Sequence, residues 1–310
     1  MKISIAGAGF YGSTLAQRVA EAGYADEVVL TDIVDGRPQG LALDLMQSRP
    51  LAGFETRVTG SNDYAATAGS DICVITAGVP RKPGMSRMDL LETNARIVAG
   101  VTRRLVAASP DTVLIVVSNP LDEMTALAAH VSGLARPRVM GQAGMLDTAR
   151  FRHFAAERLG VATSEVTAMT LGSHGETMVP VPSQVSVGGR PLTEVLDRAA
   201  IDEIVQRTRD GGAEIVALLK TGSAYFAPAA AAEAMVRAVA TDTQEVLPVS
   251  AWVEGAYGID GVYIGVPARL GRVGVEAVEE LPLADEEVAA LRAAAESVRV
   301  KQREAVALVA

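Results

Sequence analysis

KISIAGAGFYGSTLAQRVAEAGYADEVVLTD, residues Lys2 to Asp32, is the stretch that decides the fold. A β-branched run enters a glycine turn, an Ala-rich helical pattern follows, and a second apolar run, Val28–Leu30, leads to Asp32. The turn consists of Gly7, Ala8, Gly9, Phe10, Tyr11 and Gly12. Strand, glycine turn, helix, strand and acid is the order that a dinucleotide-binding βαβ unit requires.

Each glycine of the turn has a physical role in such a unit. Glycines allow the tight bend, let the backbone approach a pyrophosphate, and let the helix pack closely on the strand. Asp32 follows Gly12 by 20 residues, where a carboxylate can accept hydrogen bonds from an adenosine ribose. Glycine turns also serve ordinary packing, so the flanking strands and the acid are what favour a dinucleotide here.

The composition is typical of a globular protein with a large core. The chain has 310 residues, of which 49% are hydrophobic and 21% charged, and its net charge is -9. We expect no membrane span and no secretory signal peptide, because apolar runs are short and a strand begins at Lys2. The single cysteine, Cys73, excludes an internal disulfide and fits a reducing cytoplasm. Dispersed arginines argue against nucleic acid as a partner.

Up to residue 143 the chain alternates apolar runs with helical patterns. The predicted strands are Lys2–Ala6, Val28–Leu30, Thr56–Thr59, Asp71–Thr76, Thr112–Val117 and Arg138–Gly141. Six strands with helices between them predict a Rossmann fold, which is a doubly wound parallel sheet. Ligands bind such sheets beyond the carboxyl ends of the strands, so we expect Asp32, Thr76 and Asn119 at one site.

The pattern changes after this half. Residues 1–143 predict a dinucleotide-binding domain, and residues 144–310 predict an α+β domain on the substrate side of a cleft. Helices are predicted over Leu146–Leu159, Ile201–Lys220, Ala227–Val239 and Asp285–Val306. Strands are predicted over Glu165–Leu171, in a hairpin at Gln184–Val187, and three times between Val246 and Glu279.

Three histidines are candidates for a group that titrates near neutral pH. His130 and His153 fall inside helical patterns, where a packing or surface role is the ordinary interpretation. His174 follows a predicted strand in the loop LGSHGE, so we expect its ring to face a cleft. A solvent-exposed loop histidine without a function is the alternative.

Asp147 and Arg150 lie three residues apart in MLDTARF and point from one face of a predicted helix. They are either a surface ion pair worth less than about 1 kcal/mol, or two functional groups with different partners. In the second case Asp147 holds a histidine in one tautomer, and Arg150 offers a planar fork to a carboxylate.

A basic loop, Gly78–Met88 (GVPRKPGMSRM), follows the strand Asp71–Thr76. Its prolines and glycines predict a loop, and Arg81, Lys82 and Arg87 place three positive charges at the expected cleft. The segment is either a solvated loop or a lid that brings arginines onto an anionic substrate.

Together these motifs resemble the lactate/malate dehydrogenase family, and within it the lactate-dehydrogenase-like malate dehydrogenases. The resemblance extends from Lys2 almost to the C-terminus. Its landmarks, in the order of the family, are IAGAGFYG, Asp32, ITAGVPRKPGMSRMDLLETN, VSNPLDEMT, GQAGMLDTARF, GSHGETMVP and KTGSAYFAPAAA. Several independent motifs in one order are far more specific than any single motif.

The resemblance implies a role for each matching residue. His174 is expected to accept and donate the proton, Asp147 to orient it, and Arg150 to clamp the carboxylate beside the reacting carbon. On the basic loop, Arg87 would polarise the substrate oxygen. Arg81 would bind a second carboxylate, at a position where lactate-specific relatives normally have glutamine.

The resemblance also implies NAD as the cofactor and a cis peptide bond between Asn119 and Pro120. Asn119 is expected to contact both the substrate and the nicotinamide. The other residues expected on the cofactor side are Gly7, Ala8, Gly9, Phe10, Tyr11, Gly12, Asp32, Thr76, Ala77, Gly78, Asn94, Val117 and Ser118. A metal is not required, because the nicotinamide supplies the hydride chemistry.

The implied reaction is reversible hydride transfer between (S)-malate and oxaloacetate, by a homodimer or homotetramer. Arg81 argues against the alternatives of a lactate or a broad 2-hydroxy-acid dehydrogenase. An NAD-dependent glycoside hydrolase would need a metal held by cysteine and histidine, and a non-catalytic NAD-binding protein would leave the charged residues unexplained. Two positions depart from the family: Glu176 replaces the usual aspartate, and Ala284 lacks the usual N-cap hydroxyl.

Overall fold

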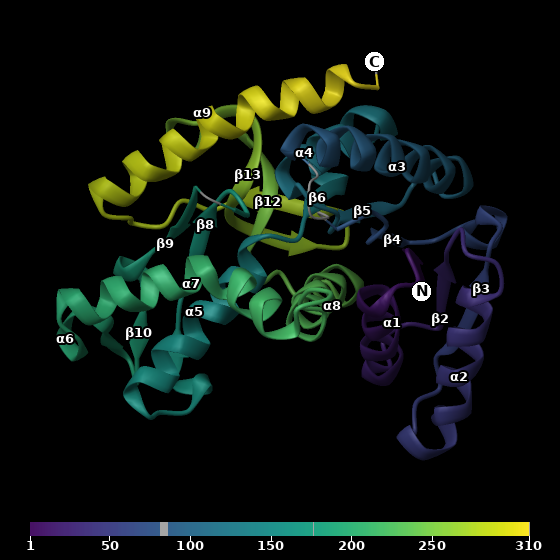
Figure 1. The fold of residues 1–310 in the computed structure, drawn as a ribbon, viewed down its shortest axis with the longest axis horizontal. Coiled ribbons are helices and arrows are strands. Elements are labelled where there is room, and N and C mark those ends of the chain that lie inside the picture. Colours follow the sequence, from purple (N-terminus) through teal and green to yellow (C-terminus); the bar gives the residue numbers. More distant parts are fainter. Residues whose placement is uncertain (81–85, 176, 310) are drawn as a thin grey trace.

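The computed structural model describes residues 1–80, 86–175 and 177–309, which form a mixed α/β fold (Figure 1). Arg81 and Glu176, both singled out above, lie outside the described residues. Arg87 is the first residue of a helix, but its side chain also lies outside the description.

The N-terminal half is a parallel sheet with helices on both faces. Its strands are β1 (Lys2–Ala6), β2 (Glu27–Thr31), β3 (Arg57–Ser61), β4 (Ile72–Ile75), β5 (Val113–Val116) and β6 (Val139–Gly141). They lie in the order β3-β2-β1-β4-β5-β6 and all pair in parallel. The connecting helices are α1 (Phe10–Ala22), α2 (Arg37–Ala52), α3 (Arg87–Ala108) and α4 (Leu121–Ser132). This is the doubly wound Rossmann sheet that the sequence predicts.

The central strand β5 shows why its sequence is apolar throughout. Val113 and Ile115 pack into a core that contains residues of α1, whereas Leu114 and Val116 pack into a core that contains residues of α3 and α4. Side chains alternate between the two faces of a strand, so burial on both faces requires an uninterrupted apolar run.

Helix α3 begins where the sequence supplies a capping box. The Oγ of Ser86 accepts the backbone N–H of Asp89 at 3.1 Å, and Oδ2 of Asp89 accepts the backbone N–H of Ser86 at 3.0 Å. These reciprocal bonds satisfy two N–H groups that a helix N-terminus leaves unpaired. They fix the point at which the basic loop ends and the helix starts.

The C-terminal half is α+β, as predicted. Its helices are α5 (Gly144–Leu159), α6 (Leu192–Val195), α7 (Arg198–Leu219), α8 (Phe226–Thr241) and α9 (Asp285–Ala307). Its strands are β7 (Val166–Thr167), β8 (Thr170–Gly172), β9 (Met178–Pro180), β10 (Ser186–Val187), β11 (Arg190–Pro191), β12 (Val246–Glu254), β13 (Asp260–Gly271) and β14 (Gly274–Val278). Short 3₁₀ helices lie at Tyr64–Thr67, Arg136–Arg138, Thr163–Glu165, Pro182–Gln184 and Ala256–Gly258.

The prediction of one strand over Glu165–Leu171 is wrong. β7 pairs with β10 in a small three-stranded sheet, whereas β8 pairs with β9 and β13 in the large sheet. Because the two parts pair with different neighbours, the strand is interrupted between Thr167 and Thr170. The second part, β8, is the one that leads the chain to His174.

The two halves share one large sheet, which the sequence does not predict. Ser250 of β12 pairs with Gly141 of β6, and the sheet continues through β13, β8 and β9. A Cβ at position 141 would lie 2.4 Å from Oγ1 of Thr125 in α4 and 3.1 Å from Cβ of Ser250 in β12, so glycine lets both elements approach β6 closely. The loops that follow β5 and β8 are therefore held in one rigid framework.

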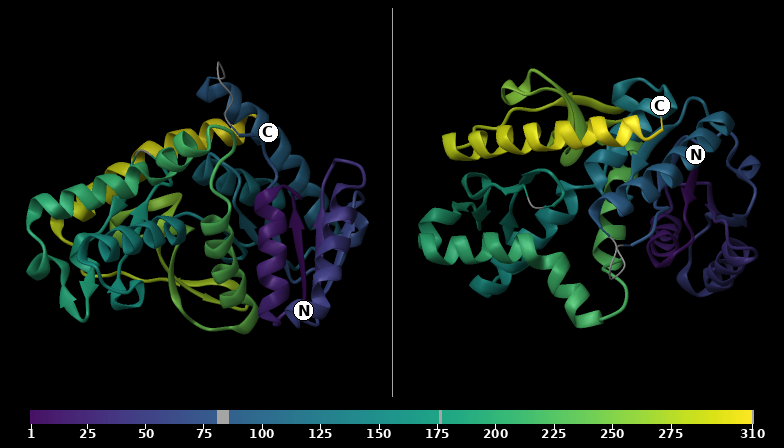
Figure 2. Two further views of the ribbon diagram at one scale, coloured as in Figure 1. Left: turned by 60° about the horizontal axis from the view of Figure 1, so that its bottom comes forward. Right: turned by 45° about the horizontal axis from the view of Figure 1, so that its top comes forward.

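The last helix, α9, runs back from the C-terminal half across α4 (Figures 1 and 2). Nε2 of Gln302 donates to the carbonyl oxygens of Asp122 at 3.1 Å and Tyr263 at 2.6 Å, which ties the helix to both halves. At its start Ala284 has no capping oxygen, but Oε2 of Glu287 accepts the N–H of Ala284 at 2.9 Å. One of the two capping-box bonds is thus retained.

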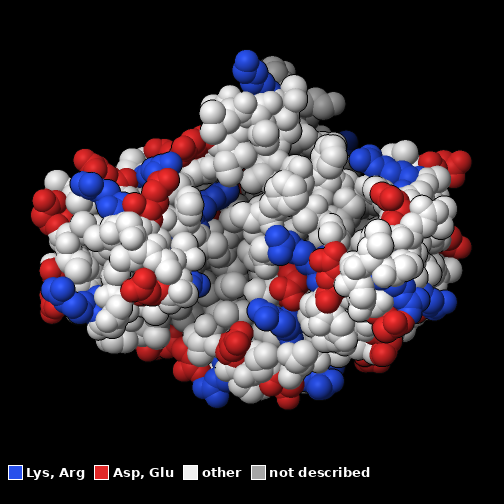
Figure 3. Space-filling model, turned by 90° about the horizontal axis from the view of Figure 1, so that it is seen from below, with Lys and Arg blue, Asp and Glu red and all other residues white. Residues whose placement is uncertain are grey.

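The face seen in Figure 3 carries Lys and Arg interspersed with Asp and Glu on the left and the right of the view. The described part of the chain contains no helix that is both long enough and apolar enough to cross a membrane. Cys73, on β4, is buried.

Candidate active site

The glycine turn between β1 and α1 has the geometry that its sequence predicts. Gly7 has a φ of 117°, and a Cβ there would lie 2.5 Å from Oγ1 of Thr76. A Cβ at Gly12 would lie 1.8 Å from the carbonyl oxygen of Gly7, whereas a Cβ at Gly9 would have no atom within 4 Å. Gly7 and Gly12 therefore serve the bend and the helix packing, and Gly9 leaves open backbone at the N-terminus of α1.

Asp32, directly after β2, lies against this turn. Its Oδ2 accepts the backbone N–H of Ala8 at 2.7 Å, and its Oδ1 accepts the backbone N–H of Val34 at 2.9 Å. Hydrogen bonds to an ionised carboxylate are strong, so these two orient the side chain beside the turn.

A cavity of about 640 Å³ opens beside the turn, within the size range of small-molecule sites. The predicted cofactor residues that line it are Gly9, Phe10, Tyr11, Thr76, Gly78, Asn94, Val117, Ser118 and Asn119. Those that do not line it are Gly7, Ala8, Gly12, Asp32 and Ala77. The carboxyl ends of β1, β4 and β5 thus meet at one cavity, as the topology of a parallel sheet predicts. The peptide bond between Asn119 and Pro120 is cis, as the resemblance implies.

Asn94 and Ser118 brace the loops that follow β4 and β5. Oδ1 of Asn94 accepts the backbone N–H of Val79 at 2.8 Å. Nδ2 of Asn94 donates to the carbonyl oxygens of Val79 at 3.1 Å and Asn119 at 2.6 Å. Oγ of Ser118 donates to the carbonyl oxygen of Ala77 at 2.5 Å. The cavity edge formed by these two loops is therefore held together by the protein's own hydrogen bonds.

His174 and Asp147 form a hydrogen-bonded pair at the same cavity. His174 follows β8 and lines the cavity, while Asp147 projects from the first turn of α5. Nδ1 of His174 lies 2.9 Å from Oδ2 of Asp147, whose side chain is only 2% exposed. An ionised carboxylate can only accept, so Nδ1 carries the proton and Nε2 is the ring nitrogen left for other partners.

Arg150, one turn further along α5, contacts the same carboxylate. Its Nη1 lies 3.2 Å from Oδ1 of Asp147, and its side chain is 14% exposed and lines the cavity. The interpretation of Asp147 and Arg150 as a surface ion pair is therefore wrong. The expectation of different partners is only partly right, because Asp147 contacts Arg150 as well as His174.

The surroundings of His174 raise its pKa above the usual value of 6.5. Burial opposes this rise because it disfavours the imidazolium, whereas the charge and hydrogen bond of Asp147 favour the imidazolium. Arg150 repels the imidazolium, and the buried carboxyl of Asp122 attracts it. The raised pKa favours the imidazolium, which is the form of the ring that can donate a proton.

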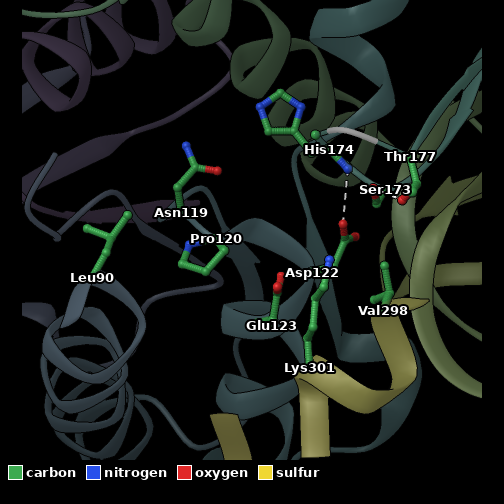
Figure 4. Close-up of a pocket in the computed structure, with 11 residues that line it drawn as sticks. Leu90, Asn119, Pro120, Asp122, Glu123, Ser173, His174, Thr177, Val298 and Lys301 are labelled. Atoms are coloured by element: carbon green, nitrogen blue, oxygen red, sulfur yellow. Dashed lines mark hydrogen bonds between the residues drawn. The ribbon is translucent and has the colours of Figure 1, made fainter. Parts of the chain in front are cut away.

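Asp122, in the first turn of α4, is a site residue that the sequence reasoning missed. It is 2% exposed, and its Oδ2 accepts the backbone N–H of His174 at 3.0 Å while Oδ1 accepts the hydroxyl of Ser250 at 2.7 Å. Figure 4 shows the imidazole turned away from this carboxylate, which holds the backbone of the loop rather than the ring. Burial raises the pKa of Asp122 to about 7. The signal available in the sequence was an acid within the largely apolar stretch after Pro120.

The cavity has further lining residues that the sequence did not single out. They are Val79, Pro80, Gln142, Leu146, Gly212, Val216, Leu219, Thr221, Gly222, Ser223, Ala224, Tyr225 and Pro228. Most come from α7, from α8 and from the segment between these helices, which belongs to the motif KTGSAYFAPAAA. Nε2 of Gln142 is buried without a hydrogen-bond partner among the described residues.

A second cavity, of about 250 Å³, lies next to His174 and α9 (Figure 4). Its lining residues are Leu90, Asn119, Pro120, Asp122, Glu123, Ser173, His174, Gly175, Thr177, Val298 and Lys301. His174 and Asn119 line both cavities, so the loops after β8 and β5 stand between them.

The other two histidines lie away from this arrangement. His130 ends up exposed on α4 and His153 exposed on α5, as their ordinary interpretation predicts. Within residues 1–80, 86–175 and 177–309, no three His, Cys, Asp or Glu side chains are grouped so that they could hold a metal ion.

Comparison with known proteins supports the resemblance over the whole length of the chain. Residues 1–141 match the family model described as lactate/malate dehydrogenase, NAD binding domain. Residues 144–309 match the model of the alpha/beta C-terminal domain of the same family. A curated malate dehydrogenase from Roseiflexus castenholzii is 54% identical over 297 residues, which cover 96% of both chains.

Solved structures agree with these matches. The malate dehydrogenase from Salinibacter ruber is 49% identical with a TM-score of 0.94, and the match covers 98% of this chain and 97% of that one. The lactate dehydrogenase from Cryptosporidium parvum, solved with lactic acid and β-nicotinamide adenine dinucleotide, is 42% identical with the same TM-score and coverage. With both halves matched by family models and nearly the full length matched by relatives, this chain belongs to the lactate/malate dehydrogenase family.

Proposed function

We propose that this chain is an NAD-dependent malate dehydrogenase that interconverts (S)-malate and oxaloacetate. The observation that carries the proposal is the His174–Asp147 pair, 2.9 Å apart, beside Arg150 at a cavity bordered by the glycine turn. The oxidation of a 2-hydroxy acid needs a proton acceptor, a cation that binds the carboxylate and a turn that binds the dinucleotide. The relative from Roseiflexus castenholzii, named a malate dehydrogenase, supports a dicarboxylate substrate.

NAD fits the glycine turn on chemical grounds. Gly9 leaves the backbone at the N-terminus of α1 open, and the N–H groups and dipole of a helix N-terminus stabilise a pyrophosphate. We assign recognition of the ribose to Asp32, whose negative charge would repel the 2′-phosphate of NADP. When bound, the nicotinamide ring exchanges a hydride with the substrate carbon.

In this proposal the protein's own residues hold the substrate and move one proton. Nε2 of His174 accepts the hydroxyl proton of malate, and the imidazolium returns it to the carbonyl oxygen of oxaloacetate in the reverse direction. Asp147 keeps the proton on Nδ1 and stabilises the imidazolium. Arg150 presents its guanidinium to the carboxylate beside the reacting carbon.

The remaining substrate contacts are proposed from the resemblance. Arg87 would offset the charge that develops on the reacting oxygen, and Arg81 would bind the second carboxylate. Asn119, which lines both cavities, would contact the substrate and the nicotinamide.

A lactate or broad 2-hydroxy-acid dehydrogenase is the second candidate, because a structural relative 42% identical to this chain was solved with lactic acid. The test follows the absorbance of NADH with oxaloacetate and then with pyruvate. We expect kcat/KM to be at least about 100-fold higher with oxaloacetate, because a site built for a second carboxylate rejects a substrate that lacks it. A preference for pyruvate would reject the dicarboxylate assignment. Failure to oxidise NADH with either acid would reject the proposal that the chain is a dehydrogenase.

We also propose that residues 1–143 form the NAD-binding domain and residues 144–310 the catalytic domain.

Assembly into a homodimer or homotetramer is supported by apolar side chains that α2 exposes, of which Leu43 is 60% and Leu51 93% exposed. A single, buried cysteine suits a reducing compartment, which favours the cytoplasm.

A further inference from the structure

Two aromatic residues of the glycine turn contact the opposite wall of the large cavity. This wall, residues 220–228, comprises the segment between α7 and α8 and the start of α8. The rings of Phe10 and Tyr225 stack with their centroids 5.4 Å apart and 25° between their planes. The hydroxyl of Tyr11 donates to the carbonyl oxygen of Pro228 at 2.7 Å. Both contacts join the N-terminal half to the C-terminal half at the cavity.

Helix α8 packs along α1, but the segment between α7 and α8 has few other connections to the N-terminal half. As far as the structure describes the chain, residues 220–225 make no hydrogen bond to that half, and their backbone bonds reach only positions 216, 219 and 229. Lys220 and Gly222 have positive φ values of 60° and 95°, so the segment follows neither a helix nor a strand. Phe10 therefore holds this segment against the glycine turn, and Tyr11 ties the first turn of α8, which follows the segment, to the same turn.

We propose that Tyr11 is a positioning residue whose hydroxyl fixes the spacing between the glycine turn and the wall, and thereby the width of the cavity that receives the dinucleotide. The proposal rests on the proposed function only in taking NADH as the ligand. Tyr11 is a lining residue of the cavity and its hydroxyl ends on a carbonyl in the first turn of α8, so the side chain acts as a spacer. Burial holds the pKa of Tyr11 above its usual range, so the hydroxyl remains a donor near neutral pH.

A second tyrosine provides a matched control. Tyr24 lies just beyond the C-terminal end of α1, and its hydroxyl donates to Oε1 of Glu233 in α8 at 3.2 Å. Tyr11 and Tyr24 thus make the same kind of contact with the same helix from opposite ends of α1. Of the two, Tyr11 lines the cavity and Tyr24 does not.

The experiment compares Tyr11→Phe with Tyr24→Phe in the full chain. The Kd of NADH is measured from its fluorescence without substrate, and kcat is measured for oxaloacetate at saturating NADH. We expect Tyr11→Phe to raise the Kd about fivefold, the size of one net hydrogen bond, and to leave kcat within about twofold. Tyr24→Phe should leave both quantities unchanged, although each variant loses one partly buried hydrogen bond and should show a similar fall in Tm.

Two results would overturn the proposal. One is a Kd for Tyr11→Phe equal to that of the parent. The other is an equal rise in Kd for Tyr24→Phe, which would reflect the general strength of the contact between α1 and α8. If Tyr11→Phe does not fold, Phe10→Leu replaces it, because Phe10 is 73% exposed; this variant removes the stack and must raise the Kd. A parent that binds NADH and shows the expected difference between variants, but does not reduce oxaloacetate, rejects the proposed reaction and not the role of Tyr11.

Discussion

His174 and Asp147 are joined by a 2.9 Å contact between Nδ1 and Oδ2, although they are 27 residues apart and come from different elements. The carboxylate is 2% exposed, so its charge acts on the ring with little screening by water. The pair therefore couples the protonation of the ring to a fixed negative charge inside the protein.

Replacement of His174 by alanine removes the proposed proton acceptor and leaves the glycine turn intact. We expect the Kd of NADH to stay within about twofold, while turnover of oxaloacetate falls by about 100-fold or more. Fluorescence titration and steady-state kinetics measure the two quantities. Full activity in a folded variant would refute the catalytic role.

Asp147→Asn should shift the pH dependence of catalysis, because Asp147 raises the pKa of His174. Reduction of oxaloacetate needs the imidazolium, so kcat/KM is high below this pKa and falls as the pH rises through it. The variant loses the stabilising charge, so its falling limb should move to lower pH. A pH profile of kcat/KM at saturating NADH measures the shift. A falling limb at the same pH as in the parent would mean that Asp147 does not raise the pKa of His174.

Asp122→Asn should change how stability depends on pH. Burial raises the pKa of Asp122 from 3.8 to about 7, so the folded protein keeps a proton that the unfolded chain releases. The free energy of unfolding of the parent therefore contains a contribution that is present at low pH and lost as the pH rises toward 7, by at most about 1.4 kcal/mol per pH unit.

The amide of Asp122→Asn can accept the N–H of His174 and donate to Ser250, but it does not titrate. We therefore expect the stability of the variant relative to the parent to increase from about pH 4 to about pH 7 and then level off. Denaturant unfolding at a series of pH values measures this difference. A difference that does not vary with pH would show that Asp122 is ionised throughout.

Replacement by alanine should have different effects at two glycines of the turn: it should lower stability at Gly12 and weaken NADH binding at Gly9. A Cβ at Gly12 would lie 1.8 Å from a backbone oxygen, so Gly12→Ala should cost about 3 kcal/mol of stability or prevent folding. Gly9 has a φ of -79° and no atom near its Cβ position, so Gly9→Ala should keep the Tm of the parent. It should nevertheless raise the Kd of NADH about tenfold, because the methyl group occupies space proposed for the pyrophosphate. Unchanged NADH binding in Gly9→Ala would place the pyrophosphate elsewhere.

The sequence predicts the N-terminal half well because local signals determine it. The uninterrupted apolar run Val113–Val116 indicates a strand buried on both faces, and the glycine turn fixes where α1 begins. Alternating strands and helices then permit few topologies besides the doubly wound sheet.

The features that the sequence does not predict depend on distant partners. Asp122 accepts from His174 and Ser250, which are 52 and 128 residues away in sequence, so its local sequence shows an acid in an apolar stretch but not its partners. The break between β7 and β8 likewise follows from pairing with β10 on one side and β13 on the other. Tertiary pairing outweighs local propensity in both cases.

In the proposed site, the choice of substrate depends most on Arg81, whose role is proposed from the resemblance. Oxaloacetate carries a second carboxylate that pyruvate lacks, and Arg81→Gln removes the positive charge proposed to bind it. We expect the KM of oxaloacetate to rise at least about tenfold and the use of pyruvate to improve. Lys82→Gln, which removes a neighbouring charge from the same loop, is the control and should change neither. Equal effects of the two variants would mean that the loop attracts anions only through its overall charge, and an unchanged KM in Arg81→Gln would mean that Arg81 does not bind the second carboxylate.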